Sequence, residues 1–131
     1  MRCLEEQVMA QPALVAVVDD DESVRESLPD ALKRIGFAAS AFASAEEFLA
    51  SDFIVDAQCL ILDVNMPGMS GPELQRELIR RGHAIPTIFI TAQSPESIPP
   101  SLLEQGAVEC LFKPFSKEDL RAALDTALTR K

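Results

Sequence analysis

The stretch that decides the fold is Cys59-Leu60-Ile61-Leu62-Asp63, a continuous apolar run that ends on a carboxylate. Its apolar part, 59–62, is typical of a strand that is covered on both faces of a sheet. Similar runs predict three further strands, at 14–18, 87–90 and 108–112. A weaker, alanine-rich run at 37–42 predicts a fifth strand at the edge of the sheet.

Helical patterns lie between and after the apolar runs, and serine caps mark three of the expected helix starts. In each cap a serine is followed three residues later by an acid, at Ser44, Ser70 and Ser116. Pro29 falls inside the first helical segment, where it removes a backbone hydrogen bond and predicts a kink or a late helix start. Further prolines restrict the fourth helix to a core at 101–105. Because strand and helix alternate, we expect a parallel sheet with helices on both faces.

The composition fits one soluble domain and argues against two kinds of partner. The chain has 131 residues, of which 1–12 are expected to form an N-terminal arm and 13–129 the folded domain. A net charge of -9 disfavours direct binding to nucleic acid. No apolar run is long enough to span a bilayer, the N-terminus lacks the apolar core of a signal peptide, and the scattered cysteines suit reduced thiols. We therefore expect a cytoplasmic location.

Polar side chains follow four of the five predicted strands at the point where each strand ends. The acidic run 19–22 follows the first strand, and Asp63 follows the third. Thr91 and Lys113 follow the fourth and the fifth. The carboxyl ends of parallel strands meet at one edge of an open sheet, which is where such sheets bind ligands. The sequence therefore predicts that carboxylates, a hydroxyl and an ammonium converge on one crevice.

Neighbouring carboxylates in such a crevice need a positive counter-charge. Two carboxylates about 4 Å apart repel each other by roughly 4 kcal/mol at an effective dielectric constant of about 20. Hard oxygen ligands without histidine or cysteine favour Mg²⁺, with Mn²⁺ as a substitute. With this cation beside it, Asp63 would act as a nucleophile that forms an acyl phosphate, while Thr91 and Lys113 bind the phosphoryl oxygens.

Four segments together carry a resemblance to a known family. They are Val17-Val18-Asp19-Asp20-Asp21-Glu22, Leu62-Asp63-Val64-Asn65-Met66-Pro67-Gly68-Met69-Ser70-Gly71, Ile90-Thr91-Ala92 and Phe112-Lys113-Pro114-Phe115. Over about 13–129 the chain resembles the receiver domain of bacterial two-component response regulators. Residues 22–28 and 106–108 are similar to the nitrogen-fixation branch of these regulators in particular.

The resemblance implies a flavodoxin-like (CheY-like) α/β fold, a five-stranded parallel sheet of order 2-1-3-4-5 with five helices on both faces. It implies a signalling domain rather than an enzyme, which accepts a phosphoryl group on Asp63 from a partner sensor histidine kinase. The domain would catalyse its own phosphorylation and dephosphorylation. Its output would pass to a downstream protein or to a DNA-binding domain that this chain does not contain. A phosphorylation-dependent dimer would form through the fourth helix, the fifth strand and the fifth helix.

The resemblance also implies a ligand set for Mg²⁺ at the strand ends. Asp20 and Asp63 would bind the cation directly, together with the backbone carbonyl of Asn65. Asp19 would bind the cation through a water molecule. These roles follow from matching the family's motifs to this chain, residue by residue.

A second group of residues would carry the switch. The resemblance makes Thr91 the switch hydroxyl and Lys113 the family's lysine, with a cis peptide bond between Lys113 and Pro114. Many members carry an aromatic residue three positions before this lysine, and that residue moves inward together with the hydroxyl. Here the position is Cys110, so we expect weaker or rerouted coupling to the surface. Oxidant sensing is an alternative role for Cys110, although its apolar strand favours an inert thiol.

Two other functions compete for the acidic segment after the first strand. In a haloacid-dehalogenase-like phosphatase Asp19 would be the nucleophile and Asp21 the acid. That class requires a further acidic pair at a strand end after Lys113, where none occurs, and it leaves the motif around Asp63 unexplained. A calcium-binding loop would need glycine at the position of Val24. The sequence thus favours phosphoryl transfer to Asp63.

Overall fold

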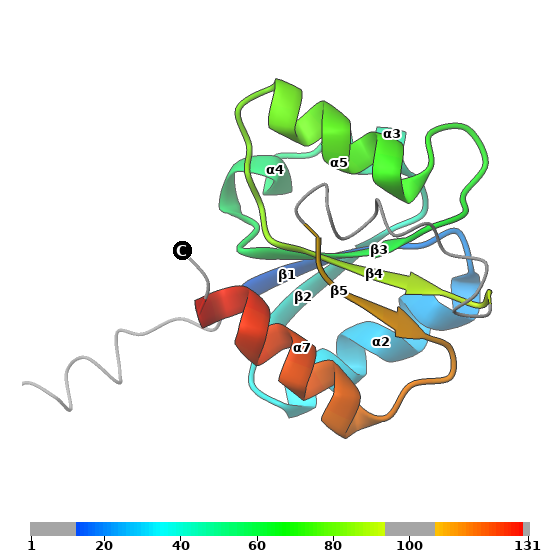
Figure 1. Ribbon diagram of the computed structural model, residues 1–131, viewed down its shortest axis with the longest axis vertical. Coiled ribbons are helices and arrows are strands. Elements are labelled where there is room, and N and C mark those ends of the chain that lie inside the picture. The colour runs from blue at the N-terminus through cyan, green and yellow to red at the C-terminus, as the bar shows by residue number, and fades with distance from the viewer. Residues whose placement is uncertain (1–12, 94–106, 130–131) are drawn as a thin grey trace, which may run out of the picture.

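A computed structural model describes residues 13–93 and 107–129 and places five parallel strands in one sheet (Figure 1). The strand order is β2-β1-β3-β4-β5, as predicted. The strands are β1 (Leu14–Val18), β2 (Ala38–Phe42), β3 (Cys59–Asp63), β4 (Thr87–Thr91) and β5 (Ala107–Phe112). The helices within these residues are α2 (Glu22–Arg34), α3 (Ala45–Leu49), α4 (Phe53–Asp56), α5 (Gly71–Arg80) and α7 (Lys117–Thr129). The predicted arm (1–12) and fourth-helix core (101–105) lie outside the described residues.

The sheet is the middle layer of three, and helices cover both of its faces, as predicted (Figure 1). α2 and α7 cover one face, while α3, α4 and α5 cover the other. Alternate side chains of a strand point to opposite faces, so β1 sends Val15 and Val17 into the core beneath α2 and α7. Its intervening residues, Ala16 and Val18, enter the core beneath α5. Burial on both faces explains why β1, β3 and β4 are continuous apolar runs in the sequence.

Side-chain caps mark the starts of α2, α3, α5 and α7, whereas α4 begins without one. Ser44 and Ser116 each accept a hydrogen bond from the backbone N–H three residues later, and Ser70 forms a full capping box, as predicted. Asp21 forms a fourth cap, which the serine-based pattern did not predict. Its carboxylate accepts hydrogen bonds from the backbone N–H and the hydroxyl of Ser23 at the start of α2. The Asp21 carboxylate is therefore tied to the helix rather than free for chemistry.

The structure corrects three details of the predicted elements. α2 begins at Glu22 and includes Pro29, so the predicted late start of this helix is wrong. β3 and β4 extend one residue beyond their predicted ends and include Asp63 and Thr91, because both residues still pair with the next strand. The connection between β2 and β3 holds two short helices, α3 and α4. Among the described helices none is long and apolar enough to cross a membrane.

Candidate functional site

The carboxyl ends of β1, β3, β4 and β5 lie along one edge of the sheet. The ends of β1 and β3 are in register, and the last residues of β3 and β4 each pair with a residue of the next strand. This register brings together the four residues that the sequence singled out at the strand ends, Asp19, Asp63, Thr91 and Lys113. The edge therefore combines negative charge, a hydroxyl and an ammonium.

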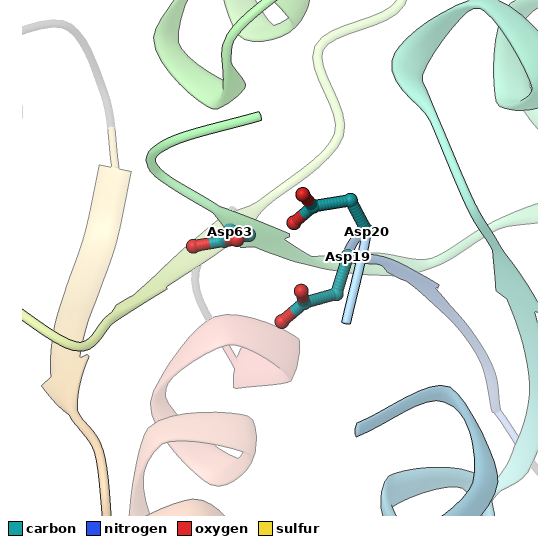
Figure 2. A group of neighbouring side chains, drawn as sticks. All are labelled: Asp19, Asp20 and Asp63. Carbon is teal, nitrogen blue, oxygen red and sulfur yellow. The ribbon is translucent and has the colours of Figure 1, made fainter. Parts of the chain in front are cut away.

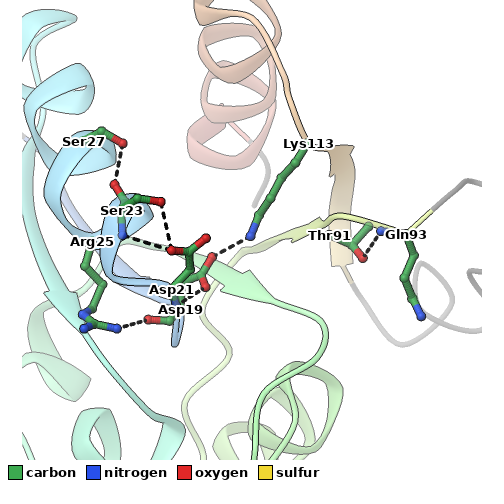
Figure 3. A network of polar contacts seen from close by, with 8 residues as sticks. All are labelled: Asp19, Asp21, Ser23, Arg25, Ser27, Thr91, Gln93 and Lys113. Atoms are coloured by element: carbon green, nitrogen blue, oxygen red, sulfur yellow. Dashed lines mark hydrogen bonds and ion pairs between the residues drawn. The ribbon is translucent and has the colours of Figure 1, made fainter.

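Asp19 lies immediately after β1, is fully buried, and accepts hydrogen bonds with both carboxylate oxygens (Figure 3). Its Oδ2 accepts from Nζ of Lys113 at 3.0 Å, and its Oδ1 accepts from the backbone N–H of Asp21 at 2.9 Å. Burying a carboxylate without such partners would cost several kcal/mol or force it to take up a proton. The ion pair with Lys113 therefore lets a negative charge remain in the core.

Asp19, Asp20 and Asp63 form a cluster of carboxylates at the ends of β1 and β3 (Figure 2). One oxygen of each carboxylate lies within 4.8 Å of the other two. Asp20 is exposed whereas Asp63 is 8% exposed, so the cluster is open to solvent on the Asp20 side. Hard oxygen donors that repel one another at this separation are the ligands that Mg²⁺ and Mn²⁺ prefer. The donor set therefore fits a divalent cation.

Asp63 titrates far from the usual range of a carboxyl group. Its pKa is raised from 3.8 to about 7, chiefly because burial disfavours the charged carboxylate and because the negative charge of Asp19 is close. The charge of Lys113 and a backbone hydrogen bond from Asn65 lower the pKa of Asp63 and so oppose this rise. A cation bound beside Asp63 would favour its ionised form for the same electrostatic reason.

Gly71, the first residue of α5, packs directly on the backbone of Asp63. A Cβ atom at Gly71 would lie 2.3 Å from the backbone oxygen of Asp63 and 3.2 Å from Cε1 of Phe89. The N–H of Gly71 also donates to the carbonyl of Val64 at 3.2 Å. The turn after β3 is therefore held by a residue that must lack a side chain. The sequence reasoning assigned no role to Gly71, because this contact joins segments that only the packed fold brings together.

Thr91 and Lys113 are joined through the backbone at the ends of β4 and β5. The N–H of Lys113 donates to the carbonyl of Thr91 at 2.8 Å, and the Lys113–Pro114 peptide bond is cis. Thr91 is fully buried, and its hydroxyl oxygen accepts from the backbone N–H of Gln93 at 3.0 Å (Figure 3). Because this bond uses a lone pair, the hydroxyl keeps its proton for donation to a ligand.

Cys110 lies three residues before Lys113 and pairs in register with Phe89 of β4. The thiol is half-buried and packs against the core beneath α5. Burial, together with the neighbouring charge of Glu109, raises the pKa of Cys110. A raised pKa reduces the thiolate fraction, which supports the inert role over the oxidant-sensing alternative.

Comparisons with known proteins show which family has this combination of fold and site. The sequence pattern of the response regulator receiver domain matches residues 15–125. The chain belongs to the response regulator receiver family. It is a receiver domain of two-component response regulators, and the comparisons do not support the haloacid-dehalogenase alternative. The capping role of Asp21, the proposed acid of that alternative, argues in the same direction.

The receiver domain is similar to several named regulators. It is 40% identical to the response regulator protein TmoT of Ectopseudomonas mendocina over 118 residues, which are 90% of this chain and 54% of TmoT. It is 37% identical to the transcriptional regulatory protein FixJ of Azorhizobium caulinodans over 122 residues, which are 93% of this chain and 58% of FixJ. The chain spans little more than half the length of these relatives.

Solved structures of receiver domains share the fold. The crystal structure of FixJ-N has a TM-score of 0.82 and 37% sequence identity, and the match covers 93% of this chain and 98% of that chain. The BeF3-activated DrrB receiver domain has a TM-score of 0.78 and 30% identity, and the match covers 92% and 100% of the two chains. Both comparisons confirm the predicted CheY-like architecture.

Proposed function

We propose that this receiver domain accepts a phosphoryl group on Asp63 from a partner sensor histidine kinase and thereby switches a signal. The observation that carries the proposal is the surroundings of Asp63, whose carboxylate ends a buried strand within 4.8 Å of the carboxylates of Asp19 and Asp20. The ammonium of Lys113 is held beside this cluster by Asp19 at 3.0 Å. A nucleophilic carboxylate with fixed positive charge nearby is what transfer of a phosphoryl group requires.

The proposed reaction is a direct displacement at phosphorus. A carboxylate oxygen of Asp63 forms a bond to phosphorus, the bond between phosphorus and the kinase's histidine nitrogen breaks, and the electron pair stays on that nitrogen. Lys113 stabilises negative charge on the phosphoryl oxygens, and the buried hydroxyl of Thr91 donates a hydrogen bond to one of them. Self-catalysed hydrolysis of the resulting acyl phosphate, with water as the attacking group, would return the domain to its starting state.

Mg²⁺ is the proposed cofactor, with Mn²⁺ as a substitute, and it would neutralise charge on the phosphoryl group when bound. Asp20, Asp63 and the backbone carbonyl of Asn65 would be direct ligands, while Asp19 would bind through water. Both carboxylate oxygens of Asp19 already accept hydrogen bonds, which supports its indirect role. The Asp20 carboxylate has no such partner within residues 13–93 and 107–129, which leaves it free to bind a cation.

The proposed output is a contact with a downstream protein or with a DNA-binding domain of a longer regulator. The relatives TmoT and FixJ extend well beyond the segment that they share with this chain, which supports such an additional domain. A phosphorylation-dependent dimer remains a prediction; it would form through the predicted fourth helix, with its core at 101–105, together with β5 and α7. A cytoplasmic location also remains a prediction. With Cys110 in place of an aromatic residue on β5, coupling to this face is expected to be weaker or to take another route.

Labelling with a small phosphodonor tests the proposed function. The protein is incubated with Mg²⁺ and acetyl phosphate, and intact-mass and peptide mass spectrometry locate the added phosphoryl group. We expect one group on Asp63, no labelling of Asp63→Asn, and no labelling when the cation is chelated. Asp30→Asn, which changes an exposed acid of α2, is the matched control and should be labelled normally. Labelling that persists in Asp63→Asn, or that depends on Asp19 as the acceptor, would overturn the assignment.

A further inference from the structure

Arg25, in the second turn of α2, reaches back to the acidic loop that follows β1 (Figure 3). Its Nη1 donates a hydrogen bond to the backbone carbonyl of Asp19 at 3.0 Å. Its backbone N–H donates to the carbonyl of Asp21 at 3.1 Å, so one residue joins the helix to the loop twice. The sequence reasoning gave Arg25 no role, and the proposed phosphoryl transfer does not use it.

Arg25 donates to the backbone carbonyl of Asp19, and the other polar groups of Asp19 are hydrogen-bonded elsewhere. The N–H of Asp19 donates to the carbonyl of Phe42 at 3.1 Å, and its carboxylate oxygens accept from Asp21 and Lys113. β1 has already ended at this point, so the sheet offers no N–H to the carbonyl. Leaving a partly buried carbonyl without a donor costs free energy. The carbonyl of Asp19 is therefore held in the direction of the Arg25 guanidinium, which donates to it.

The direction of this carbonyl sets the position of the Asp20 backbone. A peptide unit is planar, so fixing the carbonyl of Asp19 also fixes the N–H and the Cα of Asp20. The Asp20 side chain is exposed and makes no hydrogen bond within the described ranges that could orient it independently. Its position near the carboxylates of Asp19 and Asp63 therefore depends on the backbone that leads into it.

We infer that Arg25 is a positioning residue for the cation site, which holds the Asp19–Asp20 peptide unit and so places the Asp20 carboxylate beside Asp63. The inference rests on the proposed function, in which Asp20 is a direct ligand of a divalent cation. Arg25 touches the backbone and neither the reacting atoms nor the cation.

Charge and position predict opposite effects of removing Arg25, which makes the role testable. The guanidinium is a positive charge near a cation site, so by Coulomb's law alone its removal would tighten cation binding. If the guanidinium orients Asp20, its removal would instead weaken binding, and outer partners of metal ligands typically change metal affinity by about 10- to 100-fold. A weaker affinity after removal of a like charge therefore identifies a positioning role.

The experiment is the affinity of the unphosphorylated protein for Mg²⁺, measured by isothermal titration calorimetry at fixed pH and ionic strength. Arg25→Met removes both the positive charge and the hydrogen bond. Arg25→Lys keeps the positive charge and has an ammonium group that can donate hydrogen bonds. Arg34→Met removes an exposed arginine from the last turn of the same helix and is the matched control. Thermal unfolding in the presence of a chelator shows that each variant is folded before Mg²⁺ is added.

We expect Arg25→Met to bind Mg²⁺ about tenfold more weakly than the unaltered protein, Arg25→Lys to recover part of the loss, and Arg34→Met to bind normally. The amide resonance of Asp20 should also shift in Arg25→Met before Mg²⁺ is added. If Arg25→Met does not fold, Arg25→Gln takes its place. The expectation is the same, because the glutamine side chain is shorter than that of arginine and its amide would not reach the carbonyl of Asp19.

Equal or tighter Mg²⁺ binding by the folded variant would overturn the positioning role. The proposed function would survive that result as long as the unaltered protein binds Mg²⁺ and is labelled on Asp63. An unaltered protein that binds no Mg²⁺ would overturn the proposed function and this inference together.

Discussion

Nζ of Lys113 donates a hydrogen bond to Oδ2 of Asp19 at 3.0 Å, and the two residues are 94 positions apart in the chain. The contact ties the residue after β5 to the residue after β1, although β3 and β4 lie between these strands in the sheet. Asp63, at the end of β3, therefore lies within the charge field of this pair. The Lys113 charge lowers the pKa of Asp63 while the Asp19 charge raises it.

Removing the ammonium with Lys113→Met should destabilise the protein by about 2 kcal/mol, less than the 3–5 kcal/mol typical of fully buried pairs, because the Lys113 side chain is 22% exposed. The pKa of Asp63 should rise further, since one of the charges that lower it is gone. Urea unfolding measures the first effect, and titration of Asp63 followed by NMR measures the second. Lys117→Met, at an exposed lysine of α7, is the control. An equal loss of stability in both variants would contradict the ion pair's role.

Asp63→Asn should flatten the pH dependence of stability between about pH 4 and pH 7. The pKa of Asp63 is raised from 3.8 to about 7 in the folded state, so the folded protein keeps a proton in this window that the unfolded chain has lost. The free energy of unfolding therefore falls as the pH rises through the window, and since one pKa unit corresponds to about 1.4 kcal/mol, the fall is on the order of a few kcal/mol. Urea unfolding at several pH values, with a chelator present, measures the slope.

Two comparisons make this pH prediction specific. Asp30→Asn changes an exposed acid and should keep the slope of the unaltered protein. Mg²⁺ should restore stability at the upper end of the window, because a bound cation favours the ionised carboxylate. A slope that is the same in Asp63→Asn and in the unaltered protein would show that Asp63 is not the group responsible.

Gly71→Ala should destabilise the protein by about 2 kcal/mol, although alanine favours a helix by about 1 kcal/mol over glycine, because its Cβ would overlap the backbone oxygen of Asp63. The affinity for Mg²⁺ should fall as well, since relieving the overlap displaces Asp63. Gly82→Ala is the control, because Gly82 has a φ of +88° and no neighbour within 4 Å, so alanine there adds backbone strain alone. Unchanged Mg²⁺ affinity in Gly71→Ala would refute the proposed link to Asp63.

The two described cysteines should differ in their reaction with a thiol reagent such as DTNB. Burial raises the pKa of Cys59 to about 12, so Cys59 should react only after the protein unfolds. Cys110 is half-buried and should react in the folded protein, but more slowly than a free thiol, because its pKa is also raised. Mass spectrometry of the modified peptides, with and without urea, distinguishes the sites. Modification of Cys59 in the folded protein would contradict its assignment to the core.

The elements that were predictable from the sequence are those whose signals are local. Continuous apolar runs predicted β1, β3 and β4 because these strands are buried on both faces, whereas the edge strands β2 and β5 are only partly buried. Three serine caps predicted helix starts because the cap and its acid are only three residues apart. Even the gathering of Asp63, Thr91 and Lys113 at one edge follows from local positions, since parallel strands present the same ends to the same side.

The sequence by itself thus determined the strands, their order through the family resemblance, and which residues stand at the strand ends. Only the tertiary structure decided how those residues are held. Lys113 donates a hydrogen bond to the Asp19 carboxylate, Arg25 donates to the carbonyl of Asp19, and Gly71 packs against the backbone of Asp63. The physical reason is that these contacts depend on distances and backbone directions across packed segments, which no periodicity encodes. The raised pKa of Asp63 belongs to the same class, because burial and the charge of a neighbouring strand exist only in the folded protein.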